Sequence, residues 1–212
     1  MNLPTPKYNL NDFPTVYEPR EDTFLFLDAL EKETSYIKKL NPVTVVEIGS
    51  GSGVVITSLS HILQHKCVVF ATDVNQAACQ ATKFTAALNH CTVECINMDL
   101  LTNFKGKLFD IILFNPPYVV TEDSEIIGTG LSRAWAGGNM GRVIINRLLF
   151  KLNEYLSEKG VCYMVLLKEN DLDNIVEILA SQGFTSEIVL QRKIPGEHLF
   201  VYKFYKEWNK SV

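Results

Sequence analysis

The feature that most constrains the fold is an alternation of short apolar runs with helix-length segments. Strands are predicted at 44–49, 68–73, 92–97, 109–115 and 161–167, and helices at 53–63, 75–88, 141–156 and 171–182. Runs that are apolar throughout, rather than at every second position, are typical of strands buried on both faces. The alternation therefore predicts an α/β fold in which helices cover both sides of a mostly parallel sheet.

The end of the chain departs from this alternation. Residues 184–190 and 199–205 are strand-like and have no helix between them. Two successive strands joined by a short connection favour an antiparallel pairing. We therefore predict an antiparallel hairpin at the C-terminal edge of a seven-stranded sheet.

The start of the chain contains a lead-in and a helix. Residues 1–16 contain three prolines and little periodicity, which predicts a flexible lead-in. Apolar residues then follow helical spacing over about 21–40, and Asn41-Pro42 ends that helix. We expect residues 17–212 to form one domain.

Composition limits the partners and the compartment. The chain has 212 residues, of which 47% are hydrophobic, and a formal net charge of −4. This balance lacks the basic footprint of a protein that grips nucleic acid directly. No apolar run is long enough to span a bilayer. The five cysteines form no C-x-x-C pair, so we expect free thiols in a reducing compartment, the cytoplasm or also the nucleus.

A glycine-rich loop follows the first predicted strand, with Glu47, Gly49, Gly51 and Gly53 spaced as E-x-G-x-G-x-G. Glycines there let the backbone turn tightly and approach a ligand. The lysine of a phosphate-binding loop is missing, and the glycine spacing of the dinucleotide fingerprint fails. The loop therefore favours a ligand that contains an adenosine and no pyrophosphate.

Two aspartates end the next two predicted strands. Asp73 is placed to accept hydrogen bonds from ribose hydroxyls, and Asp99 to accept from an adenine amino group. Each also has a purely structural interpretation, because Asp73 can cap the following helix and Asp99 can stabilise a turn. The combination at successive strand ends is more specific than either residue alone.

The segment Asn115-Pro116-Pro117-Tyr118 follows the strand at 109–115. Two prolines remove two backbone donors, so the carbonyls around them offer only acceptors, and Asn115 adds its side-chain oxygen. Two acceptors can hold both N–H groups of a planar –NH2, a poor nucleophile that needs such positioning. The aromatic ring of Tyr118 can pack against that flat group. A plain Pro-Pro turn is the structural alternative.

Together these residues resemble the HemK-type class I methyltransferases, which methylate the N5 nitrogen of protein glutamines. Two further segments resemble the short eukaryotic and archaeal branch of that family. They are Tyr17-Glu-Pro-Arg-Glu-Asp-Thr-Phe24 and Ala134-Trp-Ala-Gly-Gly138 with Gly141-Arg142 after it. The resemblance covers nearly the whole chain from Tyr17 onward and implies a Rossmann-like methyltransferase domain.

The resemblance implies S-adenosyl-L-methionine as cofactor, with S-adenosyl-L-homocysteine as product, and no catalytic metal. Thr23, Glu47, Gly49 and Gly51 would line the cofactor site, Asp73 would bind the ribose, and Asp99 and Leu100 would hold the adenine. Asn115 would lie beside the cofactor and bind the target amide. Pro116, Pro117 and Tyr118 would complete the substrate grip, with Asn115, Pro116 and Tyr118 as the catalytic residues.

The family's partners follow from the same resemblance. The substrate would be the glutamine of the Gly-Gly-Gln loop in the eukaryotic class I translation release factor. A small zinc-binding activator protein would form a heterodimer through the edge strand at about 92–97. Long bacterial members carry a separate N-terminal helical domain for substrate docking. This chain has no room for one, so we expect part of the release-factor recognition to lie elsewhere.

Three other functions are compatible with parts of the pattern. A nucleic-acid adenine N6-methyltransferase uses the same turn, but the acidic balance and the lack of a target-recognition domain oppose it. A lysine methyltransferase needs its amine deprotonated, which two acceptors alone serve less well. A catalytically silent scaffold would have no need for intact acidic and Asn-Pro-Pro-Tyr positions.

Overall fold

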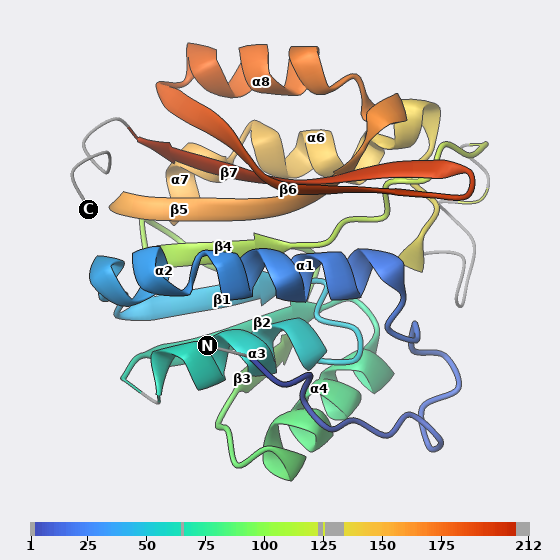
Figure 1. The fold of residues 1–212 in the computed structure, drawn as a ribbon, viewed down its shortest axis with the longest axis vertical. Coiled ribbons are helices and arrows are strands. Elements are labelled where there is room, and N and C mark those ends of the chain that lie inside the picture. Colours follow the sequence, from blue (N-terminus) through green and yellow to red (C-terminus); the bar gives the residue numbers. More distant parts are fainter. Residues whose placement is uncertain (1–2, 65, 123–124, 126–133, 207–212) are drawn as a thin grey trace.

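The computed structural model describes residues 3–64, 66–122, 125 and 134–206. The first two residues of the lead-in and the last six of the predicted domain therefore lie outside the described residues. Seven strands form one sheet in the order β3-β2-β1-β4-β5-β7-β6 (Figure 1). Their bounds are β1 Thr44–Ile48, β2 Val68–Asp73, β3 Glu94–Asn97, β4 Phe109–Phe114, β5 Leu156–Leu167, β6 Phe184–Ile194 and β7 Glu197–Lys206.

The pairing of the strands confirms the predicted sheet. β1 pairs in parallel with β2 on one side and with β4 on the other, and β4 pairs in parallel with β5. β7 runs antiparallel to both β5 and β6, so the closing hairpin is present. From β1 the chain first adds β2 and β3 on one side and then returns to add β4 on the other side. The sheet therefore has a topological switch point between β1 and β4, where such folds bind ligands.

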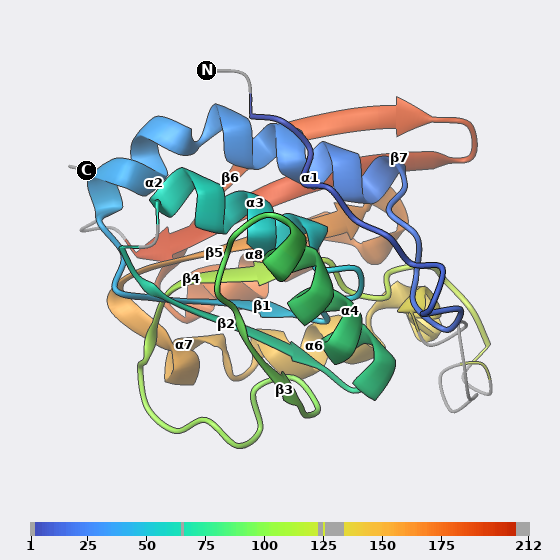
Figure 2. The same ribbon diagram turned by 90° about the horizontal axis from the view of Figure 1, so that it is seen from below.

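Helices cover both faces of the sheet. They are α1 Glu21–Lys32, α2 Thr34–Leu40, α3 Val54–Leu63, α4 Gln76–Leu88, α6 Val143–Leu149, α7 Leu152–Tyr155 and α8 Leu172–Ser181, with short 3-10 turns η2 Asn139–Gly141 and η3 Lys168–Asn170. In Figure 2 α1, α2 and α3 lie above β1 and β4, and α6 and α7 lie below these two strands. α4 packs on α3, and α8 packs on α6. The predicted helical layers are therefore both present.

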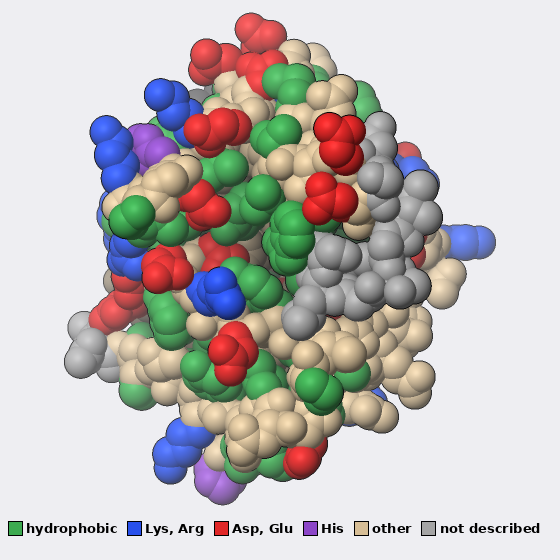
Figure 3. Space-filling model, turned by 90° about the vertical axis from the view of Figure 1, so that its right-hand side faces the viewer, with side chains coloured by type: hydrophobic (Ala, Val, Ile, Leu, Met, Phe, Trp, Pro, Cys, Tyr) green, Lys and Arg blue, Asp and Glu red, His purple; other side chains and the backbone are tan. Residues whose placement is uncertain are grey.

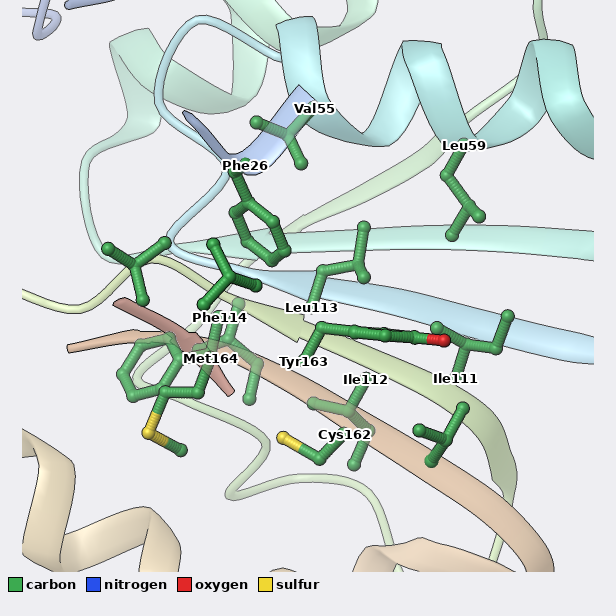
Figure 4. Packing of buried hydrophobic residues seen from close by; sticks show 14 of the residues in the cluster. Phe26, Val55, Leu59, Ile111, Ile112, Leu113, Phe114, Cys162, Tyr163 and Met164 are labelled. Atoms are coloured by element: carbon green, nitrogen blue, oxygen red, sulfur yellow. The ribbon is translucent and has the colours of Figure 1, made fainter. Parts of the chain in front are cut away.

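The core is centred on β4 and β5. Every residue of β4 is buried, which explains why this strand is apolar throughout. Figure 4 shows Phe26, Val55 and Leu59 on one side of these two strands and Cys162 and Met164 on the other. This two-sided packing holds the end of β4, and thus the turn at 115–118, in a fixed place.

The predicted helix at 141–156 is wrong as a single element. It divides into α6 and α7, and Phe150 between them is 65% exposed. The division follows from β5, which begins at Leu156 and pairs there with Phe109, so the chain must turn earlier than helical spacing indicates. The side-chain amide of Gln182 donates to the Leu149 carbonyl at 3.1 Å and satisfies the broken end.

The predicted helix at 21–40 also divides, at Glu33. The Glu33 carboxylate accepts hydrogen bonds from Lys203 Nζ at 2.8 Å and from the Tyr163 hydroxyl at 2.9 Å. Both partners lie on the sheet and are almost fully buried, so the break joins the helix to an internal polar network. Helical periodicity carries no signal for such a pairing over 130 residues of sequence.

Several boundaries differ from the predicted ones. β3 begins two residues later than predicted, at Glu94, and it lies at the sheet edge as expected. β6 and β7 extend beyond their predicted ends because polar residues pair in the outer part of the hairpin, for example Lys193 with His198. Apolar patterning does not detect strand residues that face water.

The segment predicted to be a flexible lead-in makes defined contacts with the domain. Lys7 and Asn89 exchange two hydrogen bonds, at 2.9 and 2.7 Å. The Asn75 amide donates to the Thr15 carbonyl at 3.0 Å, and Val16 is buried against α4. Within the part of the chain that the structure describes, no helix is long and apolar enough to cross a bilayer.

Candidate active site

A cavity of about 460 Å³ opens at the carboxyl ends of β1, β2 and β4, beside the topological switch point. Its volume lies within the range of small-molecule sites. Figure 3 shows this side of the molecule, where acidic side chains gather among hydrophobic ones. The predicted site residues that line the cavity are Thr23, Glu47, Gly49, Gly51, Asp73, Asp99, Leu100, Asn115, Pro116 and Pro117.

The glycine loop forms the floor of the cavity. Gly49 and Gly51 have φ angles of 67° and 51°, a left-handed conformation that favours glycine. The Gly49 N–H donates to the Thr72 carbonyl at 2.7 Å, which ties the loop to β2. No atom lies within 4 Å of where a Cβ would stand on either glycine, so the backbone faces open space. The loop is thus shaped to let a ligand approach closely.

Asp73 holds the loop from the end of β2. One carboxylate oxygen accepts from the Gly51 N–H at 3.0 Å, and the other accepts from the Asn75 N–H at 2.8 Å. The cap of α4 is Asn75, whose side chain accepts from the Ala77 N–H at 2.9 Å. Asp73 also lines the cavity, and each oxygen of a carboxylate can accept more than one hydrogen bond.

Glu47 lies at the end of β1 and is only 2% exposed. Its carboxylate accepts a hydrogen bond from the Ile56 N–H at 2.9 Å, near the start of α3. Burial raises the pKa of Glu47 well above its usual range, the Ile56 N–H opposes that rise, and the charge of Asp73 adds to it. A buried acid at a cavity wall is more typical of a ligand site than of a structural position.

Asp99 and Leu100 follow β3 and also line the cavity. Asp99 pairs with Arg147 of α6 at 2.6 Å, and both side chains are about half exposed. Leu100 has a φ of 49°, which turns the chain across the cavity mouth. Both predicted adenine contacts therefore lie at the cavity, and Arg147 adds a cation beside Asp99.

Asn115 lies at the end of β4, and its amide nitrogen donates to the Asp22 carboxylate at 2.8 Å. Because a carboxylate only accepts, this bond fixes which way the amide points. The Asn115 Oδ1 atom is buried and has no hydrogen-bond partner among the described residues. A buried acceptor without a partner costs free energy, so its retention at a cavity wall indicates a ligand donor.

Tyr118 does not line this cavity. Its side chain is 7% exposed and lines a second pocket of about 430 Å³, which shares Tyr17 and Asp22 with the first. Burial raises the pKa of the Tyr118 hydroxyl, and the charges of Asp22 and Glu197 add to that rise. Contact between its ring and the target group stays a prediction.

The sequence matches the family model described as methyltransferase small domain over residues 21–194. The chain belongs to this methyltransferase family. A relative named methyltransferase HEMK2, from Mus musculus, is 37% identical over 212 residues and covers 97% of this chain and 98% of its own length. The eRF1 methyltransferase catalytic subunit mtq2 of Schizosaccharomyces pombe is 39% identical over 220 residues, covering 97% and 95%.

A solved structure of the E. cuniculi Mtq2-Trm112 complex, described as responsible for methylation of the eRF1 translation termination factor, has the same fold. Its TM-score is 0.68 at 28% identity, and the match covers 91% of this chain and 99% of that one. Together with the HEMK2 and mtq2 relatives, this likeness confirms the HemK-type resemblance and the Rossmann-like methyltransferase fold. The chain is therefore an enzyme of the HemK type.

Asp22 and Arg147 are two of the cavity-lining residues that were not predicted as site residues. Asp22 adjoins the predicted Thr23, and a carboxylate in the first turn of a helix is ordinarily attributed to the helix dipole, which conceals its link to Asn115. Arg147 reaches Asp99 across 48 residues of sequence, and no local pattern indicates that pairing.

Proposed function

We propose that this methyltransferase transfers the methyl group of S-adenosyl-L-methionine to the side-chain amide nitrogen of a glutamine in the Gly-Gly-Gln loop of translation termination factor eRF1. The observation that carries the proposal is the buried Oδ1 of Asn115, an acceptor that belongs to a cavity-lining residue and has no hydrogen-bond partner among the described residues. The names of the relatives and of the solved complex support the substrate. Because that factor acts in translation, we place the reaction in the cytoplasm, and we include the nucleus as a second compartment.

The residues of the cavity fit the proposed cofactor. Asp73 would accept from the ribose hydroxyls, and Asp99 with Leu100 would hold the adenine. Gly49 and Gly51 present backbone with no Cβ to obstruct the ligand. Thr23 and Glu47 line the same cavity near Asn115 and would contact the methionine end. When bound, the cofactor supplies an electrophilic methyl group on a cationic sulfur.

The chemistry left to the protein is positioning. An amide nitrogen is a weak nucleophile because its lone pair is delocalised into the carbonyl. Asn115 Oδ1 would accept one N–H, and the carbonyls of the Pro116-Pro117 turn would accept the other. Both bonds polarise the –NH2 and aim it along the line of attack, a positioning effect that can contribute about 7 kcal/mol or more. The product nitrogen is acidic enough to lose its extra proton after transfer, so no strong base is needed.

The edge strand β3 supplies a surface for a small partner of the kind present in the Mtq2-Trm112 complex. β3 pairs only with β2 among the described strands, so one side of its backbone is bare. Bare edges are commonly covered by another chain, which adds a strand or packs on the edge. We expect the chain expressed alone to be poorly soluble or inactive, and co-expression with such a partner to restore both. Full activity of the pure monomer would contradict this part of the proposal.

A nucleic-acid adenine is the rival acceptor with the same chemistry. The second pocket, beside Asn115, is lined by three acidic residues, Glu21, Asp22 and Glu197, and by one basic residue, Arg20. The net negative charge there would repel phosphate groups, whereas an uncharged peptide loop would not be repelled. The acidic surroundings therefore favour a protein substrate.

The deciding experiment offers labelled S-adenosyl-L-methionine and the co-expressed enzyme to eRF1 and to DNA side by side. Mass spectrometry should find one added methyl group on the glutamine of the Gly-Gly-Gln loop. An eRF1 variant with alanine in place of that glutamine is the matched control and should take up no label. Label on DNA, or on eRF1 lacking the glutamine, would overturn the proposed substrate.

A further inference from the structure

The carboxylate of Asp22 is a point where three polar side chains of the site converge. It is 5% exposed and lies in the first turn of α1. It accepts from Asn115 Nδ2 at 2.8 Å and from the Thr23 hydroxyl at 3.4 Å. Its charge adds to the rise that burial causes in the pKa of the Tyr118 hydroxyl. It also lines both pockets. A buried carboxylate with this many partners is held in one geometry.

We infer that Asp22 is a positioning residue that sets the polarity of the Asn115 amide, and so decides that the site receives an N–H donor rather than an acceptor. The inference rests on the proposed function and deepens it. An asparagine side chain has nearly the same shape in its two flipped orientations, but the flip exchanges a donor for an acceptor. Only a neighbour of fixed polarity can choose between them. Asp22 accepts and cannot donate when ionised, so it selects the orientation that leaves Oδ1 toward the cavity.

The consequence is a specificity filter for the acceptor group. With Oδ1 presented, a glutamine amide binds through its –NH2, whereas a glutamate carboxylate meets an acceptor and the nearby negative charge of Asp22. A site built to bind N–H groups rejects a group without them because its own polar atoms remain unpaired. With the amide flipped, Nδ2 would meet the substrate –NH2 and oppose productive binding.

The test compares Asp22→Asn with Asp22→Ala in the co-expressed enzyme, using labelled S-adenosyl-L-methionine and eRF1. Asparagine preserves size and removes fixed polarity, because two amides can pair in either orientation. We expect kcat to fall about 10- to 100-fold in Asp22→Asn, the loss expected for a bond to a charged acceptor. Calorimetry should find cofactor affinity within about threefold of wild type, which also establishes that the variant is folded.

Asp28→Asn is the matched control. It makes the same chemical change on the same helix, but Asp28 pairs with Arg192 on the exposed surface. Its activity should equal that of the wild type. If Asp22 only filled space, Asp22→Asn would behave like Asp28→Asn, and only Asp22→Ala would lose activity. Wild-type kcat in Asp22→Asn would overturn the inference.

A second measurement needs no variant and no turnover. One of the two side-chain amide protons of Asn115 should exchange slowly with deuterium oxide in a ¹H–¹⁵N spectrum of the wild-type enzyme with its partner, because Nδ2 donates one N–H to Asp22. Fast exchange of both protons would also overturn the inference. This readout separates the two claims: a wild-type enzyme that methylates no glutamine defeats the proposed function, while slow exchange would still support the orientation of Asn115.

Discussion

The two ends of the cavity are built differently. At the cofactor end, Gly49 and Asp73 already make hydrogen bonds to the backbone of the loop and of β2. At the acceptor end, Asn115 has its nitrogen bonded to Asp22 and its oxygen unpaired. The loop at the cofactor end is thus held in place before any ligand arrives, whereas the acceptor end has a polar atom that still lacks a partner among the described residues.

This difference indicates a division of labour. A loop held by its own bonds binds a ligand by shape with little reorganisation, which favours affinity. An unpaired, oriented acceptor contributes most when the reacting group is polarised, which favours rate. Substitutions at the two ends should therefore separate cofactor affinity from turnover.

The largest effect is expected for Asn115→Ala. It removes the oriented acceptor, so kcat should fall by about 100- to 1,000-fold, as for other preorganised groups that act on the transition state. Radiolabel transfer to eRF1 measures the loss. Calorimetry should find cofactor affinity nearly unchanged. A kcat close to that of the wild type in Asn115→Ala would mean that the acceptor end does not act through this side chain.

A smaller loss, in binding rather than rate, is expected for Asp73→Ala. The cofactor Kd should rise about 10- to 100-fold, because hydrogen bonds to a charged acceptor contribute roughly 1.5–3 kcal/mol. Asp73→Asn keeps one acceptor oxygen and should fall between the wild type and the alanine variant. Equal affinities in all three proteins would show that Asp73 serves only the loop.

Glu47→Gln should stabilise the protein while weakening cofactor binding. Burial raises the pKa of Glu47 in the folded state, so its charged form destabilises the fold at pH values above that raised pKa. The penalty disappears as pH falls below the ordinary glutamate range, where both states are protonated. A gain of about 1 kcal/mol at neutral pH would raise Tm by roughly 2–4 °C.

Thermal melting of both proteins across this pH range checks the prediction for Glu47. The difference in Tm between Glu47→Gln and the wild type should shrink as pH falls. A difference that stays constant from neutral to acidic pH would mean that the charge of Glu47 is not its cause.

The smallest effect is expected for Arg147→Ala, which removes the half-exposed pair with Asp99. Exposed pairs contribute about 0–1 kcal/mol, so cofactor Kd should rise less than about fivefold and less still in high salt. Arg192→Ala breaks a comparable exposed pair away from the cavity and is the control. A tenfold loss in Arg147→Ala alone would make Arg147 a direct cofactor contact.

The sequence was sufficient to predict the sheet and most of the residues that gather at the proposed cofactor end of the cavity, because those features are local. An apolar strand, the glycines after it and the aspartate that ends the next strand are encoded within a few residues, and parallel strands bring their carboxyl ends together. Tyr118 shows the limit of this reasoning. Its place beside Pro117 led us to expect it in the same cavity as Asn115, whereas its side chain lines the adjoining pocket; its contact with the target stays a prediction.

The amino-acid sequence by itself determined which strand ends carry acids, glycines and amide acceptors. The tertiary structure decided how those groups are oriented. Asp22 and Asn115 are 93 residues apart, and their hydrogen bond exists only because α1 packs over the sheet near the end of β4. A side-chain amide has no intrinsic preference between its two orientations, so its polarity comes from a neighbour that only the folded chain supplies.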